Sequence, residues 1–184
     1  MSLPITVVYH SGYGHTAKVA EAVAAASGGQ LLAIDAEGNL PEGGWEQLAG
    51  ARAIVFGSPT YMGNVSWQFK KFAEASSRVW AREGWKDKLA AGFTNSASIN
   101  GDKHAVLQAL FTLSQQHGML WVGMGMLPSN TKAARRDDPN YLAGFAGLMT
   151  ATPSDAGVDE LVPGDLATAR AFGERVAAVV RRFS

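Results

Sequence analysis

Short, wholly apolar runs alternate along this chain with longer segments of helical periodicity, and this alternation constrains the fold most. The apolar runs, rich in Val, Ile, Leu, Phe and Ala, lie at residues 5–9, 31–34, 51–56, 89–93 and 119–122. Apolar residues with helical spacing lie at residues 15–27, 65–73, 106–114 and 166–179. Strands that are buried on both faces and separated by helices form a parallel sheet with helices on each side. We predict an α/β fold, a three-layer sandwich around a five-stranded parallel sheet of order 2-1-3-4-5.

The size and composition suit one globular domain, which we place at residues 1–184. Sixteen Lys and Arg balance sixteen Asp and Glu, and this formal net charge of +0 gives no bulk attraction to nucleic acid or to anionic membranes. The chain has no Cys, and its four His lack the spacing of metal ligands. It has no signal-peptide pattern and no apolar segment of the ~20 residues that span a bilayer. We expect a cytoplasmic protein without a metal site, a nucleic-acid partner or membrane insertion.

One connection is unusually long. Residues 123–164, between the last predicted strand and the last predicted helix, are rich in Gly, Pro and Asp. Loops of this length in a compact domain are usually functional or interfacial, although a mobile surface loop is the simpler alternative.

Ligands of such sheets bind beyond the carboxyl ends of the strands, where the strand order reverses. The first strand ends in small and hydroxyl-bearing residues that run directly into a helix: Ser11, Gly12, Tyr13, Gly14, His15 and Thr16. Backbone N–H groups that converge at a helix N-terminus, helped by hydroxyls, can hold a phosphate without Lys or Arg. A glycine-rich turn with a capping Ser or Thr would have the same composition. The segment has neither the Gly-Lys-Ser/Thr of a nucleoside-triphosphate loop nor a G-x-G-x-x-G turn.

Two further loops follow the third and fourth predicted strands. The first has apolar side chains that could stack on a flat ring: Pro59, Thr60, Tyr61, Met62, Gly63 and Asn64. The second is small and polar, and could line the other edge of a ligand: Thr94, Asn95, Ser96, Ala97, Ser98 and Asn100, followed by Asp102 as a helix cap. Either loop could also be an ordinary turn. The residues after the third strand are Gly57 and Ser58, so the Asp that a phospho-acceptor receiver needs is absent.

The motifs together resemble a known family. Tyr9-His-Ser-Gly-Tyr-Gly-His-Thr-Ala-Lys-Val-Ala, Phe56-Gly-Ser-Pro-Thr-Tyr-Met-Gly-Asn-Val and Gln116-His-Gly-Met are similar to segments of the flavodoxin-like FMN proteins of the tryptophan-repressor-binding-protein type. These are NAD(P)H:quinone oxidoreductases, related to the NADPH-dependent FMN reductases. The closing helix from Leu166 is also similar, and the likeness covers most of the chain.

The resemblance implies a site as well as a fold. FMN would bind with its phosphate at residues 11–16, its ring against Thr60, Tyr61 and Met62, and residues 95–100 facing the ring and the ribityl chain. Tyr13 would lie near the nicotinamide, and Trp80 would wall the substrate pocket across a subunit boundary. Gln116 stands where the family has a flavin-facing His. The loop after the fourth strand also departs from the family's Gly- and Thr-rich pattern, and the segment after the second strand is shorter.

The implied function is electron transfer from NADH or NADPH through FMN to a quinone or a similar flat acceptor, without a side-chain acid or base. Two alternatives remain: a flavodoxin-type electron carrier that docks protein partners, and a flavin-binding regulatory module. Because such carriers are typically acidic, the balanced charge favours the enzyme. The resemblance and the long loop also predict a homodimer or a homotetramer.

Overall fold

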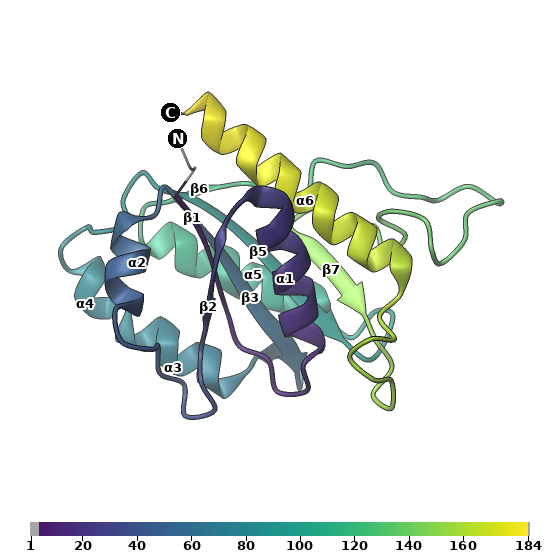
Figure 1. Ribbon diagram of the computed structural model, residues 1–184, viewed down its shortest axis with the longest axis horizontal. Coiled ribbons are helices and arrows are strands. Elements are labelled where there is room, and N and C mark those ends of the chain that lie inside the picture. The colour runs from purple at the N-terminus through teal and green to yellow at the C-terminus, as the bar shows by residue number, and fades with distance from the viewer. Residues whose placement is uncertain (1–3, 184) are drawn as a thin grey trace.

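The computed structural model describes residues 4–183 and has a parallel sheet at its centre. Its strand order is β2-β1-β3-β5-β6. These strands are β1 (Ile5–Tyr9), β2 (Gln30–Ala33), β3 (Ala53–Tyr61), β5 (Leu89–Ser96) and β6 (Leu120–Trp121). They correspond in turn to the five predicted strands, so the α/β fold is confirmed and these five follow the predicted order, but over residues 4–183 the sheet has seven strands rather than five, with two short strands off this path (Figure 1). Residues 1–3 and 184 of the predicted domain lie outside the described residues.

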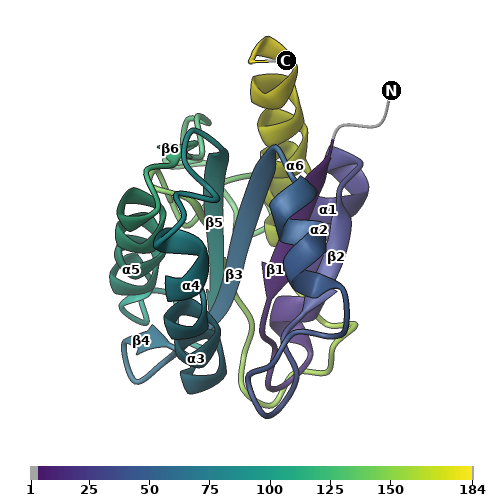
Figure 2. The same cartoon turned by 90° about the vertical axis from the view of Figure 1, so that its left-hand side faces the viewer.

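Helices cover both faces of the sheet, as Figure 2 shows. On one face α1 (His15–Ser27) and α6 (Pro163–Arg182) pack over a core of alternate strand residues such as Val7, Val55 and Phe93. On the other, α2 (Gly44–Gly50), α3 (Trp67–Ala75) and α5 (Lys103–Gln116) enclose an aromatic core, and α4 (Ser77–Trp80) continues α3. Successive strand side chains point to opposite faces, and in the central strands β1, β3 and β5 both faces are buried, which explains why these strands are largely apolar; the edge strands β2 and β6 are partly exposed.

Two separate segments pair with the outer edge of β5, where the sequence predicted a single strand. β6 pairs with the start of β5, through Leu89↔Leu120 and Ala90↔Trp121. The chain then leaves the sheet at residues 123–147 and returns as β7 (Leu148–Ala151), which pairs with the end of β5 at residues 93–96. The prediction of one loop over residues 123–164 is therefore wrong: it is an excursion, a strand and a shorter connection at residues 152–162 (Figure 1).

Two smaller features also differ from the prediction. A short antiparallel hairpin, β3 with β4 (Asn64–Val65), follows the third strand. Asp102 precedes α5 with a left-handed φ of 53° and makes no side-chain cap bond to it. In the described part of the chain, no helix is long and apolar enough to cross a membrane.

Candidate functional site

A hollow of about 260 Å³ opens at the carboxyl edge of the sheet, at the bottom of Figure 1. It brings together residues from all three loops that the sequence singled out. From these loops it is lined by Tyr13, His15, Thr16, Pro59, Thr60, Tyr61, Asn95, Ser96 and Ala97. Ser11, Gly12, Gly14, Met62 and Thr94 flank these lining residues in the chain.

The first wall is the turn from β1 into α1. Gly14 has φ 88°, a left-handed conformation that favours glycine, and it begins the helix without a side-chain cap bond. The Ser11 Oγ accepts hydrogen bonds from the backbone N–H groups of Gly14 and Ala17, each at 3.1 Å. Since these bonds use its lone pairs, the Ser11 hydroxyl can still donate its proton. The wall thus offers a donor hydroxyl beside the positive end of the α1 dipole.

The second wall is aromatic. Tyr61 reaches across to the first loop, and a Cβ added at Gly12 would lie 2.4 Å from its hydroxyl oxygen. The rings of Tyr13 and Tyr61 meet edge to face with centroids 6.1 Å apart. Burial, and to a lesser degree the nearby Tyr13, raise the pKa of Tyr61, so that its hydroxyl stays protonated. Tyr13 is 76% exposed and Met62 fully exposed, which leaves an apolar rim at the mouth of the hollow.

The third wall, at the end of β5, is held by a network of hydroxyls. Thr150 and Thr152 donate to the Asn95 Oδ1 at 2.8 and 3.0 Å. This leaves the amide nitrogen of Asn95 as the part of the side chain that can donate to a ligand. The Thr60 and Thr94 hydroxyls are 2.8 Å apart and join the second wall to the third. These buried bonds fix the polar groups before any ligand arrives.

Sequence reasoning missed a fourth wall. Thr152 and Ser154, which follow β7, complete the lining. The His15 Nε2 lies 2.9 Å from the carbonyl oxygen of Ala156 and ties this connection to the start of α1. The sequence did contain a signal for this wall. The run Thr150 to Ser154 follows a short apolar run and carries several hydroxyls, as the residues at the end of β5 do.

Some predicted residues lie outside the hollow. Gly63 and Asn64 belong to the turn and short strand beyond Met62, and Ser98 and Asn100 lie farther along the third loop. The carbonyl of Ser98 accepts a hydrogen bond from the Ser96 hydroxyl at 2.9 Å.

Trp80 and Gln116 lie at the opposite end of the sheet. Both line a hollow of about 510 Å³ together with residues such as Lys86 and Gly118, which precede β5 and β6. The eight residues of β5 separate the two ends by roughly 25 Å. The expectation that Gln116 faces the flavin of its own chain is therefore wrong, because the helix that carries it runs away from the carboxyl edge.

The surface charge is polarised along the strands although the total is balanced. The loops of the carboxyl edge, at residues 10–14, 34–43, 61–66, 96–102 and 152–162, contain no Lys or Arg. They contain seven exposed acidic residues, which we call the acidic collar: Asp35, Glu37, Glu42, Asp102, Asp155, Asp159 and Glu160. The Asp35 carboxylate accepts backbone hydrogen bonds from Asn39 and Glu37, which lower its pKa. Lys18 borders the collar, 3.6 Å from Asp159.

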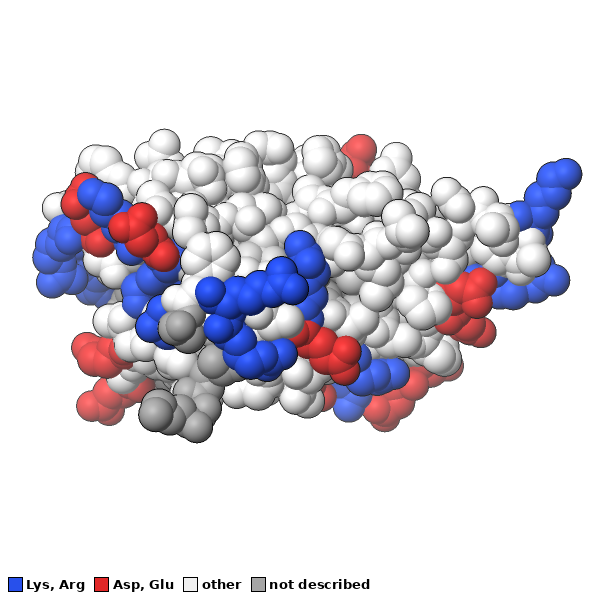
Figure 3. All heavy atoms as spheres, turned by 90° about the horizontal axis from the view of Figure 1, so that it is seen from above, with Lys and Arg blue, Asp and Glu red and all other residues white. Residues whose placement is uncertain are grey.

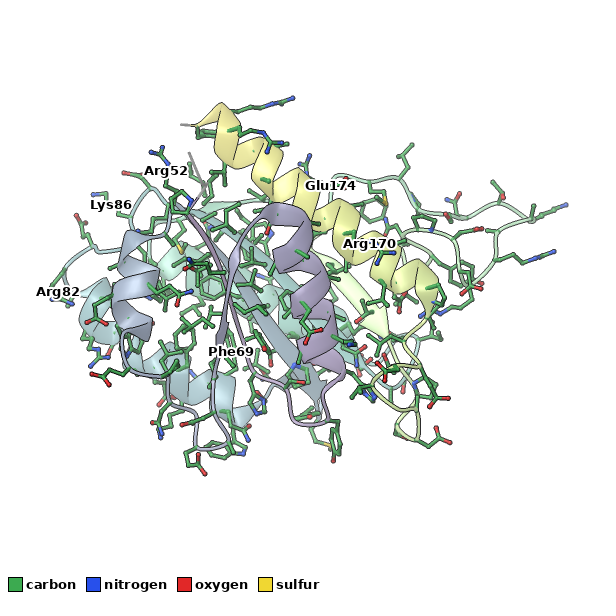
Figure 4. The ribbon with its side chains drawn as sticks, viewed as in Figure 1. Arg52, Phe69, Arg82, Lys86, Arg170 and Glu174 are labelled. Carbon is green, nitrogen blue, oxygen red and sulfur yellow. The ribbon has the colours of Figure 1, made fainter. Side chains whose placement is uncertain are left out.

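The amino edge is basic in contrast. Figure 3 shows Lys and Arg gathered on this face of the molecule with a few Asp and Glu among them, and Figure 4 shows Arg52 and Lys86 at this end, Arg82 lower on the left flank and Phe69 in the interior. Two cations bind helix ends: Lys88 donates to the carbonyls of Ala49, in the last turn of α2, and of Ala51, its C-cap, and Arg52 donates to that of Phe183 after α6.

Comparison with known proteins gives one consistent result. The family model of the NADPH-dependent FMN reductases matches residues 44–133. The chain is 50% identical over 173 residues to Flavodoxin FldP of Pseudomonas aeruginosa, covering 94% of each chain. It is 31% identical over 204 residues to an NAD(P)H dehydrogenase (quinone) of Archaeoglobus fulgidus, covering 97% of each. The crystal structure of a flavodoxin, WrbA-like protein from Agrobacterium tumefaciens is 49% identical, with a TM-score of 0.82 over 98% of both chains.

Proposed function

The chain belongs to the flavodoxin-like, FMN-binding NAD(P)H:quinone oxidoreductase family, and from this premise we propose that it transfers electrons from NADH or NADPH through FMN to a quinone-like acceptor. The observation that carries the proposal is the hollow at the carboxyl edge, whose walls combine hydroxyl and amide donors with two tyrosine rings. No side-chain acid or base is required, because the flavin supplies the redox chemistry when it is bound.

The residues present fit FMN. None of the eleven lining residues is Lys or Arg, so the phosphate has to be held by N–H groups and hydroxyls, which the turn into α1 provides. Two glycines keep the turn into α1 free of side chains. A Cβ at Gly12 would meet Tyr61, and a Cβ at Gly14 would lie 2.5 Å from Val158. The hollow is somewhat smaller than common ligand sites, which measure roughly 300–1,000 Å³. Bound FMN would therefore extend out of the hollow over its exposed rim.

We assign the roles as follows. Ser11 and Thr16 hold the phosphate, Tyr61 and Met62 lie against the ring, and Asn95 donates to its polar edge. Tyr13, exposed at the mouth, is placed to contact the nicotinamide. The hydrogen-bonded walls would orient the flat ring and shield it from water on the side that they contact, and the exposed mouth would leave room for a hydride donor and an acceptor.

A flavodoxin-type electron carrier is the second candidate, and the acidic collar favours it. The balanced net charge predicted that an acidic docking face is absent, but the described structure concentrates acidic residues around the hollow. Such a collar attracts a basic partner protein and repels the phosphates of NADPH. The relative with 50% identity is also named a flavodoxin. We regard the cytoplasmic location and the homo-oligomer as predictions for either candidate.

Rapid-mixing reduction of the FMN-loaded protein distinguishes the two functions. The oxidoreductase is supported if NADH or NADPH bleaches the flavin within seconds and benzoquinone reoxidises it over many turnovers. Bleaching only through a basic reductase protein, with strong dependence on ionic strength, would instead support the carrier. If neither route reduces the bound FMN, both functions are refuted, and the regulatory module is what remains.

A further inference from the structure

Lys103, the first residue of α5, is 1% exposed and lies directly behind the third wall of the hollow. Its ammonium donates to the Ser96 Oγ at 2.7 Å and to the carbonyl oxygen of Ser98 at 2.5 Å. Ser96 lines the hollow. The Ser96 hydroxyl accepts from Lys103 and donates its own proton to the Ser98 carbonyl at 2.9 Å, so the buried positive charge lies one residue behind the space in which a ligand binds, without a donor chain to it.

The position of this lysine is electrostatically unfavourable in the protein alone. The N-terminus of a helix carries partial positive charge, which repels a cation. A buried ammonium is also costly unless a carboxylate pairs with it, and among the described residues none forms an ion pair with Lys103.

Two charged groups face Lys103 from neighbouring elements, and each already has the other as its partner. Asp165, in the first turn of α6, accepts from Arg136 of the excursion through both oxygens, at 2.6 and 2.7 Å. The Asp165 charge raises the pKa of Lys103 and the Arg136 charge lowers it. Burial outweighs both, and lowers the pKa of Lys103 to about 8. A neighbouring anion would restore the charged form.

We propose that Lys103 is the buried counter-charge of the site and stabilises, electrostatically across the third wall, the negative charge that a bound flavin gains on reduction. The inference rests on the proposed FMN site and deepens it. Reduction of bound FMN by two electrons with uptake of one proton would add one negative charge to the ring, which in the proposed site would lie beside the third wall. A fixed cation near the polar edge of the ring stabilises the reduced form more than the oxidised form, and therefore raises the reduction potential.

The test compares Lys103→Met with the wild type and with Lys103→Arg, which keeps the charge. FMN binding to each apoprotein is measured first by fluorescence quenching. The two-electron midpoint potential of the bound FMN is then measured by dithionite titration against reference dyes from pH 6 to pH 10. At pH 7 we expect Lys103→Met to lose at least tenfold in its preference for reduced over oxidised FMN, which lowers the potential by about 30 mV. Lys103→Arg should stay close to the wild type.

The pH dependence of the midpoint potential distinguishes an electrostatic role of Lys103 from a purely structural role in holding the loop. Reduction raises the pKa of Lys103, so in the pH interval between its two pKa values wild-type protein takes up more than one proton per two electrons. The difference in midpoint potential between wild type and Lys103→Met is then largest below about pH 8, where Lys103 is charged in both redox states, and it disappears above the raised pKa. A structural role alone would weaken the binding of both flavin forms equally and leave the potential unchanged.

The outcomes separate the two proposals. If no FMN binds to the wild type, the proposed function fails. If FMN binds and its potential is the same in wild type and Lys103→Met, the role of Lys103 is refuted while the proposed function stands. Should Lys103→Met not fold, proton uptake on reduction of the wild type decides: an excess over one proton per two electrons above pH 8 supports the proposal, and its absence refutes it.

Discussion

Gly14 combines two constraints in one residue, a left-handed φ of 88° and the close approach of Val158 from the fourth wall. Gly43, before α2, has a similar φ of 76° but nothing within 4 Å of an added Cβ. The two glycines therefore allow backbone strain to be measured separately from crowding at the site.

We expect Gly14→Ala to weaken FMN binding at least tenfold, because its methyl group displaces the connection at residues 152–162 as well as straining the turn. Gly43→Ala should leave FMN binding unchanged. Each variant should lose about 1 kcal/mol of unfolding free energy through the left-handed conformation alone. Fluorescence titration and urea unfolding measure the two effects, and equal FMN affinity in both variants would contradict a phosphate site at this turn.

Two buried histidines predict a loss of stability in mild acid. His10 is 3% exposed. His117 packs against Trp85 with ring centroids 4.3 Å apart and the rings tilted by 38°, while its Nε2 lies 2.9 Å from the Ser76 Oγ. Burial lowers the pKa of both, so the unfolded chain binds protons at a higher pH than the folded protein does.

The unfolding free energy should therefore fall as the pH decreases from 7 to 5.5, by at most about 1.4 kcal/mol per pH unit for each histidine. Urea unfolding at a series of pH values measures the slope. In the double variant His10→Gln, His117→Gln the slope should be smaller, even though the variant is less stable at pH 7. An unchanged slope would mean that other groups bind the protons.

At the scale of elements, the excursion at residues 123–147 is fastened to α6 at several points, among them an ion pair between the buried Asp165 and the partly exposed Arg136. Asp165 is bound through both oxygens to Arg136, and it also accepts from the backbone N–H of Ala151 at 2.7 Å. The same carboxylate thus joins the excursion, the end of β7 and the start of α6, next to the fourth wall of the site. Removal of one member leaves the other charge buried without a partner.

We expect Arg136→Met to cost about 3 kcal/mol of unfolding free energy and to speed amide hydrogen exchange across the excursion and β7. Arg135→Met, at the exposed neighbouring residue of the same segment, is the matched control and should change either quantity little. If exchange increases equally in both variants, the excursion is held by other contacts.

These elements also show what the sequence could predict. Five apolar strands and four periodic helices follow from spacing alone, because the central strands β1, β3 and β5 are buried on both faces; β1 and α1 have the predicted bounds. β7 was missed because four residues within a Gly- and Pro-rich stretch carry little signal, and its pairing depends on the space that β6 leaves beside β5. Thr152 and Ser154 were missed with it. Lys103 could not be identified either, since only the packing shows that this lysine is buried.

At the scale of the whole molecule, the placement of Trp80 strengthens the case for a shared site. Trp80 is 53% exposed, and it lies at the amino edge, far from the hollow of its own chain. If it walls the acceptor pocket, as the family resemblance implies, a partner chain has to supply it. In a two-fold symmetric dimer this requires the two sheets to lie antiparallel, so that the carboxyl edge of each meets the amino edge of the other. The opposite charges of the two edges favour this arrangement.

Mixed oligomers test the arrangement directly. Trp80→Ala should bind FMN normally but raise the KM for quinone about tenfold, whereas Gly14→Ala should lack FMN at limiting cofactor concentration. In a heterodimer of the two variants, the FMN-loaded hollow of the Trp80→Ala chain meets the intact Trp80 of the Gly14→Ala chain, which restores one complete site. Co-expression should therefore recover quinone turnover with the wild-type KM, and light scattering should show a dimer or a tetramer. A protein that is a monomer at full activity, or mixed oligomers with no recovery, would show that each chain forms its acceptor pocket alone.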